Sequence, residues 1–595
     1  MSEYFLGITI VLVLGIFAQW VAWAFRLPSI LLLLLTGILV GPILGWIDPD
    51  RLFADLLFPV ISLSVAVILY EGGLTLRFRD VRRVRGSVFA LISIGMLITW
   101  LVGSWGAQAL LGFKFEMAVL LGALLTVSGP TVIIPLLRHV RPAAPLGAIL
   151  RWEGILIDPV GALMAVLVLE AILDGSFESA SLAIIQGALY TLLVGSVLGA
   201  AGALIMILLL RRYWLPDYLH NPVSLMILFI IYALSNYLRP ESGLLAATVM
   251  GMVLANWKGV VVQHIVEFKE NLRVLLISSL FIVLGARLKL EDLSLIDFNS
   301  VLFLLLLIFV ARPIAVFAST ALSKLSWREK LFLSFVAPRG IVAAAVSSLF
   351  ALELSHSGVA GAELLVYDVF FVIIGTVAFY GFLATPIATL LGVRLKNPQG
   401  AVIVGGHLFA REIARALNQE NFRTVIIDAN YNNILDAKSE GLEVYHGNVL
   451  SEHIIDELDL NGIGKLFALT RNDDANSLAA LHFIEEFGRS EVYQLASADS
   501  SQSGNDASAI YLRGRILFDR PVHFNDLKEA FERGAKIKTT TLSEQYGFEE
   551  FKNDHGDNAL PLFLINENEL LVFTESGKLK PRPGSKLVYV DLRGE

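Results

Sequence analysis

Thirteen long apolar segments fill the first two thirds of this 595-residue chain. A helix needs about 20 apolar residues to cross the hydrocarbon core of a membrane. In lipid, a spanning segment must also satisfy its backbone hydrogen bonds internally, which favours helices. The sequence therefore predicts a polytopic α-helical membrane protein of about 13 transmembrane helices, near residues 4–25, 28–46, 54–76, 88–111, 115–138, 147–173, 181–210, 222–238, 242–256, 271–287, 299–322, 329–352 and 364–392.

The remainder of the chain has the mixed composition of a soluble α/β domain, and the change occurs near residues 392–400. We expect a transmembrane domain over 1–395, a Rossmann-like nucleotide-binding domain over 396–510 and a small regulatory subdomain over 511–595. The chain has no cysteine, which excludes disulfides and thiolate metal sites. Its formal charge of −8 argues against a nucleic-acid partner.

The distribution of basic residues predicts the orientation of the spans, because arginine and lysine in short loops favour the cytoplasmic side. Loops after even-numbered spans carry few of them, with Arg287 and Lys289 as the exception. This charge pattern and the odd number of spans predict that the N-terminus lies outside and the C-terminal domain in the cytoplasm. The membrane is expected to be the inner or plasma membrane of the cell. The basic residues after odd-numbered spans are Arg77, Arg79, Arg82, Arg83, Arg85, Arg138, Arg141, Arg211, Arg212, Lys258, Lys269, Lys324, Arg328 and Lys330.

Spans five and twelve are each interrupted by proline and glycine, at Ser128-Gly129-Pro130 and Pro338-Arg339-Gly340. Proline removes a backbone donor, and an adjacent glycine lets the helix unwind. The two interruptions are seven spans apart, as expected if spans 1–6 and 8–13 form inverted repeats. Broken helices at matching places in two halves point to a transporter site.

Span six carries Asp158, which is the candidate carrier of the transported ion. An ionised carboxylate offers oxygens to Na⁺ or K⁺, and the same group becomes neutral when it is protonated. Thr126, Ser128 and Thr131 in the break of span five would supply further oxygen ligands, or would merely satisfy the kinked backbone. This interpretation requires a route between Asp158 and water.

Glu153 and Arg339 are costly in a membrane as single charges. We expect them to form a structural ion pair between spans six and twelve; the alternative is that Glu153 guides ions at the cytoplasmic entrance. Glu71 and Asp368 are further intramembrane acids, to which the sequence assigns no firm role. We expect Glu71 to face the arginines that follow span three.

The soluble part begins with a buried strand and a glycine-containing turn, and a second strand ends in Asp428 about 20 residues later. With this spacing, a phosphate group can bind at the N-terminus of the helix, and a ribose can form a hydrogen bond with the carboxylate of Asp428. Of the pattern G-x-G-x-x-G the chain keeps Gly405, with His407 and Ala410 in place of the other glycines. His407 would crowd a pyrophosphate, so a mononucleotide is favoured over intact NAD; an unliganded turn is the alternative.

Taken together, these motifs resemble the monovalent cation:proton antiporters of the sodium/proton and potassium/proton exchanger branch. The matching residues include Glu71-Gly72-Gly73-Leu74, the two breaks, Glu153 with Asp158, and Phe281–Arg287. The resemblance implies a thirteen-helix inverted-repeat fold, a homodimer, elevator-like alternating access and ion transport by Asp158. Such exchangers usually carry asparagine or aspartate before this acid, where this chain has Ile157; a single titrating acid favours one-for-one, electroneutral exchange.

The soluble part resembles the TrkA-type domain that regulates potassium conductance. Asn448, Thr470 and Asp474 match the positions that complete its nucleotide site. The resemblance implies regulation by AMP, NAD(H) or a similar adenine nucleotide, with no cofactor required for transport.

The sequence thus predicts a secondary antiporter that exchanges Na⁺ or K⁺ for H⁺, contributes to pH homeostasis and is not an enzyme. A potassium channel with the same regulatory domain is the alternative, but the chain has no Thr-Val-Gly-Tyr-Gly-like filter. A membrane-anchored nucleotide enzyme would need a complete dinucleotide motif, which is also missing. The choice between Na⁺ and K⁺ does not follow from the sequence.

Overall fold

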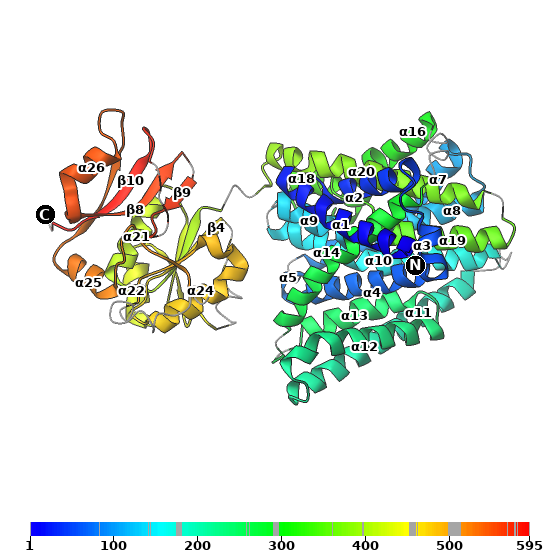
Figure 1. Cartoon of the computed structure of the whole chain (residues 1–595), viewed down its shortest axis with the longest axis horizontal. Coiled ribbons are helices and arrows are strands. Elements are labelled where there is room, and N and C mark those ends of the chain that lie inside the picture. Colours follow the sequence, from blue (N-terminus) through cyan, green and yellow to red (C-terminus); the bar gives the residue numbers. More distant parts are fainter. Residues whose placement is uncertain are drawn as a thin grey trace. The chain divides into compact units, whose positions relative to one another are not determined.

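A computed structural model gives the architecture of the chain (Figure 1). The chain forms two compact units, Met1–Arg394 and Leu395–Glu595. The structure describes every residue except 1, 26, 82–83, 141, 143, 174–180, 258, 261, 289–296, 360, 395–397, 452–457, 459, 461, 498–512, 568, 576, 578, 580 and 594–595.

The first unit is helical, and each of the thirteen predicted spans falls on one helix or on consecutive helical segments of the described residues. Eight of the described helices are long and apolar enough to cross a membrane by themselves. The segments are α1 (Ser2–Phe25), α2 (Ser29–Ile38) with η1 (Leu39–Ile43), α3 (Pro49–Phe53) with η2 (Ala54–Leu56) and α4 (Leu57–Leu74), α5 (Phe78–Val81), α6 (Arg85–Ala90) with η3 (Leu91–Gly95) and α7 (Met96–Leu110), α8 (Phe115–Leu124), α9 (Pro130–Val140), α10 (Ala144–Leu173), α11 (Ser181–Arg211), α12 (Asp217–Leu238), α13 (Ser242–Ala255), α14 (Gln263–Ala286), α16 (Phe298–Leu306) with η4 (Leu307–Ala311) and α17 (Arg312–Ser319), α18 (Trp327–Ser334), α19 (Ile341–His356) and α20 (Ala362–Leu390).

These helices pack as two groups. The scaffold group contains α1, α2, α4 and α11–α14, of which α11, α12 and α13 run side by side along one edge of the unit (Figure 1). The core group contains α7–α10 and α16–α20, and α10 contacts α8, α9 and α19. Each group therefore combines spans from the first and the second half of the unit, as an inverted repeat requires.

The two predicted helix breaks are confirmed. The α8 helix ends at Leu124 and α9 begins at Pro130, while α18 ends at Ser334 and α19 begins at Ile341. The breaks touch each other, because a Cβ atom added to Gly340 would lie 2.3 Å from the Cα of Gly129. Two glycines thus let the unwound backbones cross in direct contact.

Two charged residues differ from the sequence-based expectation, and the structure shows the partner of a third. Lys269 belongs to α14, which begins at Gln263, and it is fully buried with its Nζ 4.9 Å from the ring centre of Tyr70, so it is not a loop residue. Glu71 pairs with Arg273 of α14 at 2.7 Å. Arg287, the exception to the charge pattern, pairs with Asp50 at 3.0 Å.

The second unit contains a six-stranded parallel sheet of order β3-β2-β1-β4-β5-β6. An antiparallel four-stranded sheet of order β7-β10-β8-β9 follows it. The elements are β1 (Gly400–Val404), α21 (Leu408–Gln419), β2 (Thr424–Asp428), α22 (Tyr431–Ser439), β3 (Glu443–His446), β4 (Ile463–Ala468), α24 (Asp473–Phe487), β5 (Val492–Gln494), β6 (Arg515–Ile516), α25 (Phe524–Glu532), β7 (Lys536–Thr541), α26 (Phe548–His555), β8 (Ala559–Asn566), β9 (Glu569–Val572) and β10 (Lys586–Asp591).

Candidate ion-binding site

Asp158 lies in the middle of the 30-residue helix α10 and exposes none of its surface. Both of its carboxylate oxygens are buried and have no hydrogen-bond partner within the described part of the chain. The next residue, Pro159, has no amide hydrogen, so the helical hydrogen bond that position 159 would donate to the carbonyl of Ile155 is missing. A buried carboxyl group without partners is costly unless it is protonated or holds a cation.

The break of span five passes over the same turn of α10. A Cβ atom on Gly161, three residues after Asp158, would lie 2.8 Å from the hydroxyl oxygen of Thr126. That hydroxyl donates to the carbonyl of Ala123 at 2.7 Å, which leaves its oxygen lone pairs available to a cation. Ser128 is also buried in the break. The side chain of Thr131, the third predicted oxygen ligand, lies outside the described residues.

The predicted partner of Glu153 is wrong. Glu153 pairs with Arg312 of α17, whose Nη2 donates to Oε2 at 2.9 Å and whose Nη1 donates to Oε1. Arg312 also donates to the backbone carbonyls of Leu333, at 3.2 Å, and Val336, at 3.4 Å. It therefore neutralises both a buried carboxylate and the negative C-terminal end of the broken helix α18.

Arg339 has a separate position at the crossing of the two breaks. Its Nη1 donates to the carbonyl of Thr126 at 3.3 Å, and its backbone amide donates to the hydroxyl of Thr376 at 3.2 Å. Thr126 follows the C-terminal end of α8, so Arg339 stabilises the carbonyl end of this second half-helix. The site thus places one arginine on the negative end of each broken helix, and only Arg312 has a carboxylate partner among the described residues.

Arg312 is the candidate site residue that the sequence analysis missed. It lies inside an apolar span, and an ionisable residue there is a functional candidate by default. The same signal could have found Arg273, which lies in α14 and pairs with Glu71. Proximity of Arg339 to a proline–glycine break favoured the wrong partner for Glu153.

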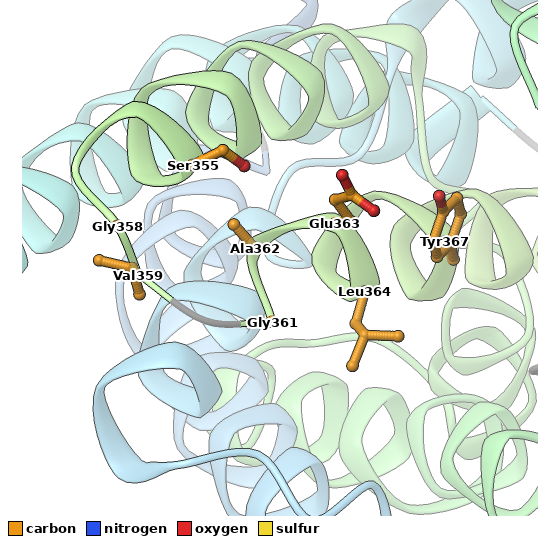
Figure 2. A pocket seen from close by; sticks show the side chains of 8 residues that line it. All are labelled: Ser355, Gly358, Val359, Gly361, Ala362, Glu363, Leu364 and Tyr367. Carbon is orange, nitrogen blue, oxygen red and sulfur yellow. The ribbon is translucent and has the colours of Figure 1, made fainter.

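The expected route between Asp158 and water is not open in this conformation. A surface hollow of about 480 Å³ lies between the end of α19 and the start of α20, where Ser355, Glu363 and Tyr367 contribute to its lining (Figure 2). None of the predicted ion-binding residues lines it. Asp158 exposes none of its surface in this structure, so the predicted access of this carboxyl group to water is not confirmed.

In the second unit, the predicted nucleotide residues gather at the carboxyl ends of β1, β2 and β4. Gly405 has φ of +105°, which favours glycine, and a Cβ atom there would lie 3.1 Å from the carbonyl oxygen of Leu469. Asp428 accepts hydrogen bonds from the amide of Gly406 and the side chain of Asn433, each at 2.7 Å. This edge lies where the strand order reverses, the usual ligand position in such sheets.

The other predicted nucleotide residues lie at the same edge, in different surroundings. The His407 ring is half-buried and packs against the ring of Phe524, with 4.8 Å between their centres. Burial lowers the pKa of His407, the nearby cations Arg411 and Lys528 add to this effect, and Asp428 opposes it. The remaining predicted residues are the buried Ala410, the exposed Asn448, and Thr470 and Asp474, which lie after β4 and in the first turn of α24.

The two crossing breaks beside a buried acid without a partner among the described residues are typical of a helical membrane antiporter, and this one carries an α/β domain. Comparison with known proteins agrees: the model of the transmembrane sodium/hydrogen exchanger family matches residues 8–390, and that of the TrkA-N domain matches residues 401–507. The chain belongs to the sodium/hydrogen exchanger family. It is a secondary transporter of the cation/proton antiporter class and not an enzyme.

Relatives of known function are similar over the membrane unit. Na(+)/H(+) antiporter 1 of Methanocaldococcus jannaschii is 29% identical over 373 residues, which cover 60% of this chain and 84% of the relative. The K(+)/H(+) antiporter NhaP of Alkalimonas amylolytica is 24% identical over 400 residues, or 66% of this chain and 68% of the relative. The structure of the sodium proton antiporter MjNhaP1 from M. jannaschii at pH 8 matches with a TM-score of 0.57 and 27% identity, covering 66% of this chain and all of that one.

Proposed function

We propose that the protein exchanges one Na⁺ or K⁺ for one H⁺, and that Asp158 binds the two in turn. The observation that carries this proposal is the pair of buried Asp158 oxygens without a partner among the described residues. A proton satisfies this carboxyl group in one state. In the other, a cation binds the carboxylate together with oxygens of Thr126 and Ser128.

The charges of the candidate site residues support electroneutral exchange. Arg312, Arg339, Glu153 and an ionised Asp158 together carry no net charge. A bound proton and a bound monovalent cation each add one positive charge, so the two loaded states carry the same charge across the membrane. The membrane potential then favours neither direction of exchange.

The experiment is proton flux in proteoliposomes that contain a pH-sensitive dye. Addition of Na⁺ or K⁺ should dequench the dye, and the rate should be unchanged when a potassium–valinomycin diffusion potential of either sign is imposed in the Na⁺ assay. A rate that rises with one sign of the potential and falls with the other would exclude the one-for-one stoichiometry. The relatives are named for Na⁺ and for K⁺, so both cations are substrates to compare.

We also propose that an adenine nucleotide regulates transport by binding the second unit, with AMP or NAD(H) as the candidate classes. The TrkA-N match and the acid at the end of β2 support this assignment. Addition of AMP or NADH on the side of the second unit should change the exchange rate. Asp428→Ala should abolish that response and leave the exchange rate without nucleotide unchanged.

The proposed topology has the N-terminus outside and the second unit in the cytoplasm. The chain has no cysteine, so single cysteines can be introduced without background. An impermeant maleimide added to intact cells should label Ser357→Cys, after span twelve, and should not label Lys324→Cys, after span eleven. The reverse pattern would refute this topology.

The resemblance to such antiporters also favours a homodimer, and the exchange would contribute to cytoplasmic pH homeostasis. Size determination of the purified protein in nanodiscs tests the first statement. Growth of a strain lacking the protein at alkaline pH and high Na⁺ or K⁺ tests the second; unimpaired growth would contradict it.

A further inference from the structure

Glu170 forms an ion pair that joins the core group of helices to the scaffold group. It lies in the last turn of α10, the helix of the core group that also carries Asp158. Its Oε2 atom accepts a hydrogen bond from the Nη2 atom of Arg239 at 2.6 Å. Arg239 directly follows α12, which belongs to the scaffold group. The contact therefore crosses the boundary between the two groups.

The ion pairs of the membrane unit that are described above have a different placement, because each stays on one side of this boundary. One joins α10 to α17 within the core group, and two join α14 to α4 and to α3 on the scaffold side. These pairs are Glu153 with Arg312, Glu71 with Arg273, and Asp50 with Arg287. A movement of one group against the other leaves these three pairs intact and separates Glu170 from Arg239.

The guanidinium group of Arg239 is held on the scaffold by α11. Its Nε atom donates to the hydroxyl of Thr191 at 3.3 Å, and this hydroxyl donates to the carbonyl of Gly187 at 2.9 Å. A Cβ atom on Gly187 would lie 3.1 Å from Nη2 of Arg239 and 3.1 Å from Cδ2 of Leu167 on α10. The glycine thus leaves room for the guanidinium group at the place where α11 packs against α10. Thr191 is a positioning residue, because it orients Arg239 toward Glu170.

Alternating access requires one group of helices to move against the other around the ion site. Because Asp158 and Glu170 share α10, a movement that carries the ion site also carries Glu170. Hydrogen bonds between nitrogen and oxygen span only about 2.7–3.2 Å, so a small displacement of α10 breaks the contact with Arg239. The ion pair therefore belongs to the present conformation, in which Asp158 exposes none of its surface.

We propose that Glu170 and Arg239 form a latch, which holds the core group against the scaffold group in this conformation and thereby slows exchange. This inference rests on the proposed exchange at Asp158 and names two residues that set its rate. The side chains of Glu170 and Arg239 are 38% and 22% exposed, so water weakens their attraction and the latch can open in every transport cycle. A buried pair such as Glu153 with Arg312 would be far more costly to separate.

The first test is a reversible cross-link in the full-length chain, which has no cysteine of its own. Glu170→Cys with Arg239→Cys, joined by a short bis-methanethiosulfonate reagent and reconstituted in proteoliposomes, should show no cation-driven proton flux. Reduction with dithiothreitol should restore the flux of the same protein without the reagent. The matched control is Thr191→Cys with Arg239→Cys, which joins two residues of the scaffold group and should keep its flux after cross-linking.

The second test removes the ion pair without a cross-link. Partly exposed ion pairs are weak, so Glu170→Gln and Arg239→Gln should each raise the exchange rate per folded protein about two- to fivefold. The variant with both changes should be no faster than the faster single variant, because both changes remove the same contact. Glu353→Gln is the control, since it neutralises an exposed acid on α19 of the core group and should leave the rate unchanged.

The outcomes separate the latch from the function on which it rests. Undiminished flux after cross-linking of Glu170→Cys with Arg239→Cys, or an equal block in the Thr191→Cys control, would overturn the latch and leave exchange at Asp158 in place. Rates of Glu170→Gln and Arg239→Gln no higher than that of the wild type would do the same. Absence of cation-driven flux from the wild type itself would overturn both.

Discussion

The ion pair between Glu153 and Arg312 makes a quantitative prediction about stability. Both side chains are buried, at 2% and 6% exposure, and the guanidinium group binds the carboxylate through two nitrogens. Arg312→Met would leave a buried carboxylate without its partner and should cost about 3–5 kcal/mol of the free energy of unfolding. Glu153→Gln keeps an oxygen acceptor but leaves the buried Arg312 guanidinium without its counter-charge, so it should also cost about 3–5 kcal/mol.

The double variant is expected to cost less than the two single variants added together. Once Glu153 is neutral, removal of Arg312 no longer leaves an unpaired charge, so the coupling energy should be about 2–3 kcal/mol. The assay is chemical unfolding of the four purified proteins in one detergent. A parallel cycle of Glu153→Gln with Arg339→Met is the control and should give a smaller coupling, because Arg339 donates to Thr126 and Thr376 and makes no hydrogen bond to Glu153 among the described residues.

Two results would refute this reasoning. Additive effects of Arg312→Met and Glu153→Gln would mean that the two charges do not depend on each other. Rescue of Arg339→Met by Glu153→Gln would mean that Arg339 is the partner of Glu153 after all.

Two further predictions concern the crossing of the breaks and the nucleotide unit. Gly340→Ala should reduce the folded yield and the exchange rate, because the added Cβ would lie 2.3 Å from the Cα of Gly129. The control is Gly147→Ala on α10, which has open space around its Cβ position and should behave like the wild type. Fluorescence-detected size-exclusion and flux assays measure the two effects. Equal effects of the two changes would contradict the crossing. The pKa of His407 is lowered in the folded protein, so the folded protein binds a proton at this ring less readily than the unfolded chain does. Neutral His407 therefore leaves the stability of the folded protein intact above about pH 6.5, and that stability is lost as the pH falls below this value. Thermal unfolding between pH 7.5 and 5.5 should therefore show a steeper loss of stability for the wild type than for His407→Gln, and parallel pH curves would contradict the assignment.

The sequence was sufficient to predict the spans and the two breaks. Length and apolar composition identify a membrane helix by themselves, and proline beside glycine marks an interruption at Gly129 and Gly340. The strand before Gly405 and the strand that ends in Asp428 followed from a spacing that is similarly local in the chain.

Pairing between distant residues could not be predicted in the same way. Glu153 is 159 residues from Arg312 and 186 residues from Arg339, and only the packing of α10 against the other helices of the core group decides which arginine it meets. Likewise, Lys269 resembles a loop lysine until α14 is seen to begin at Gln263 and to pack against Tyr70.

The most direct test of ion exchange at Asp158 is the rate of cation-driven proton flux in proteoliposomes that contain Asp158→Asn. Asparagine has nearly the same shape but cannot exchange a proton, so the variant should fold and show no exchange with either Na⁺ or K⁺. Asp368→Asn, which changes a half-buried acid on α20, is the matched control and should retain exchange. Exchange by Asp158→Asn at the wild-type rate would contradict the account.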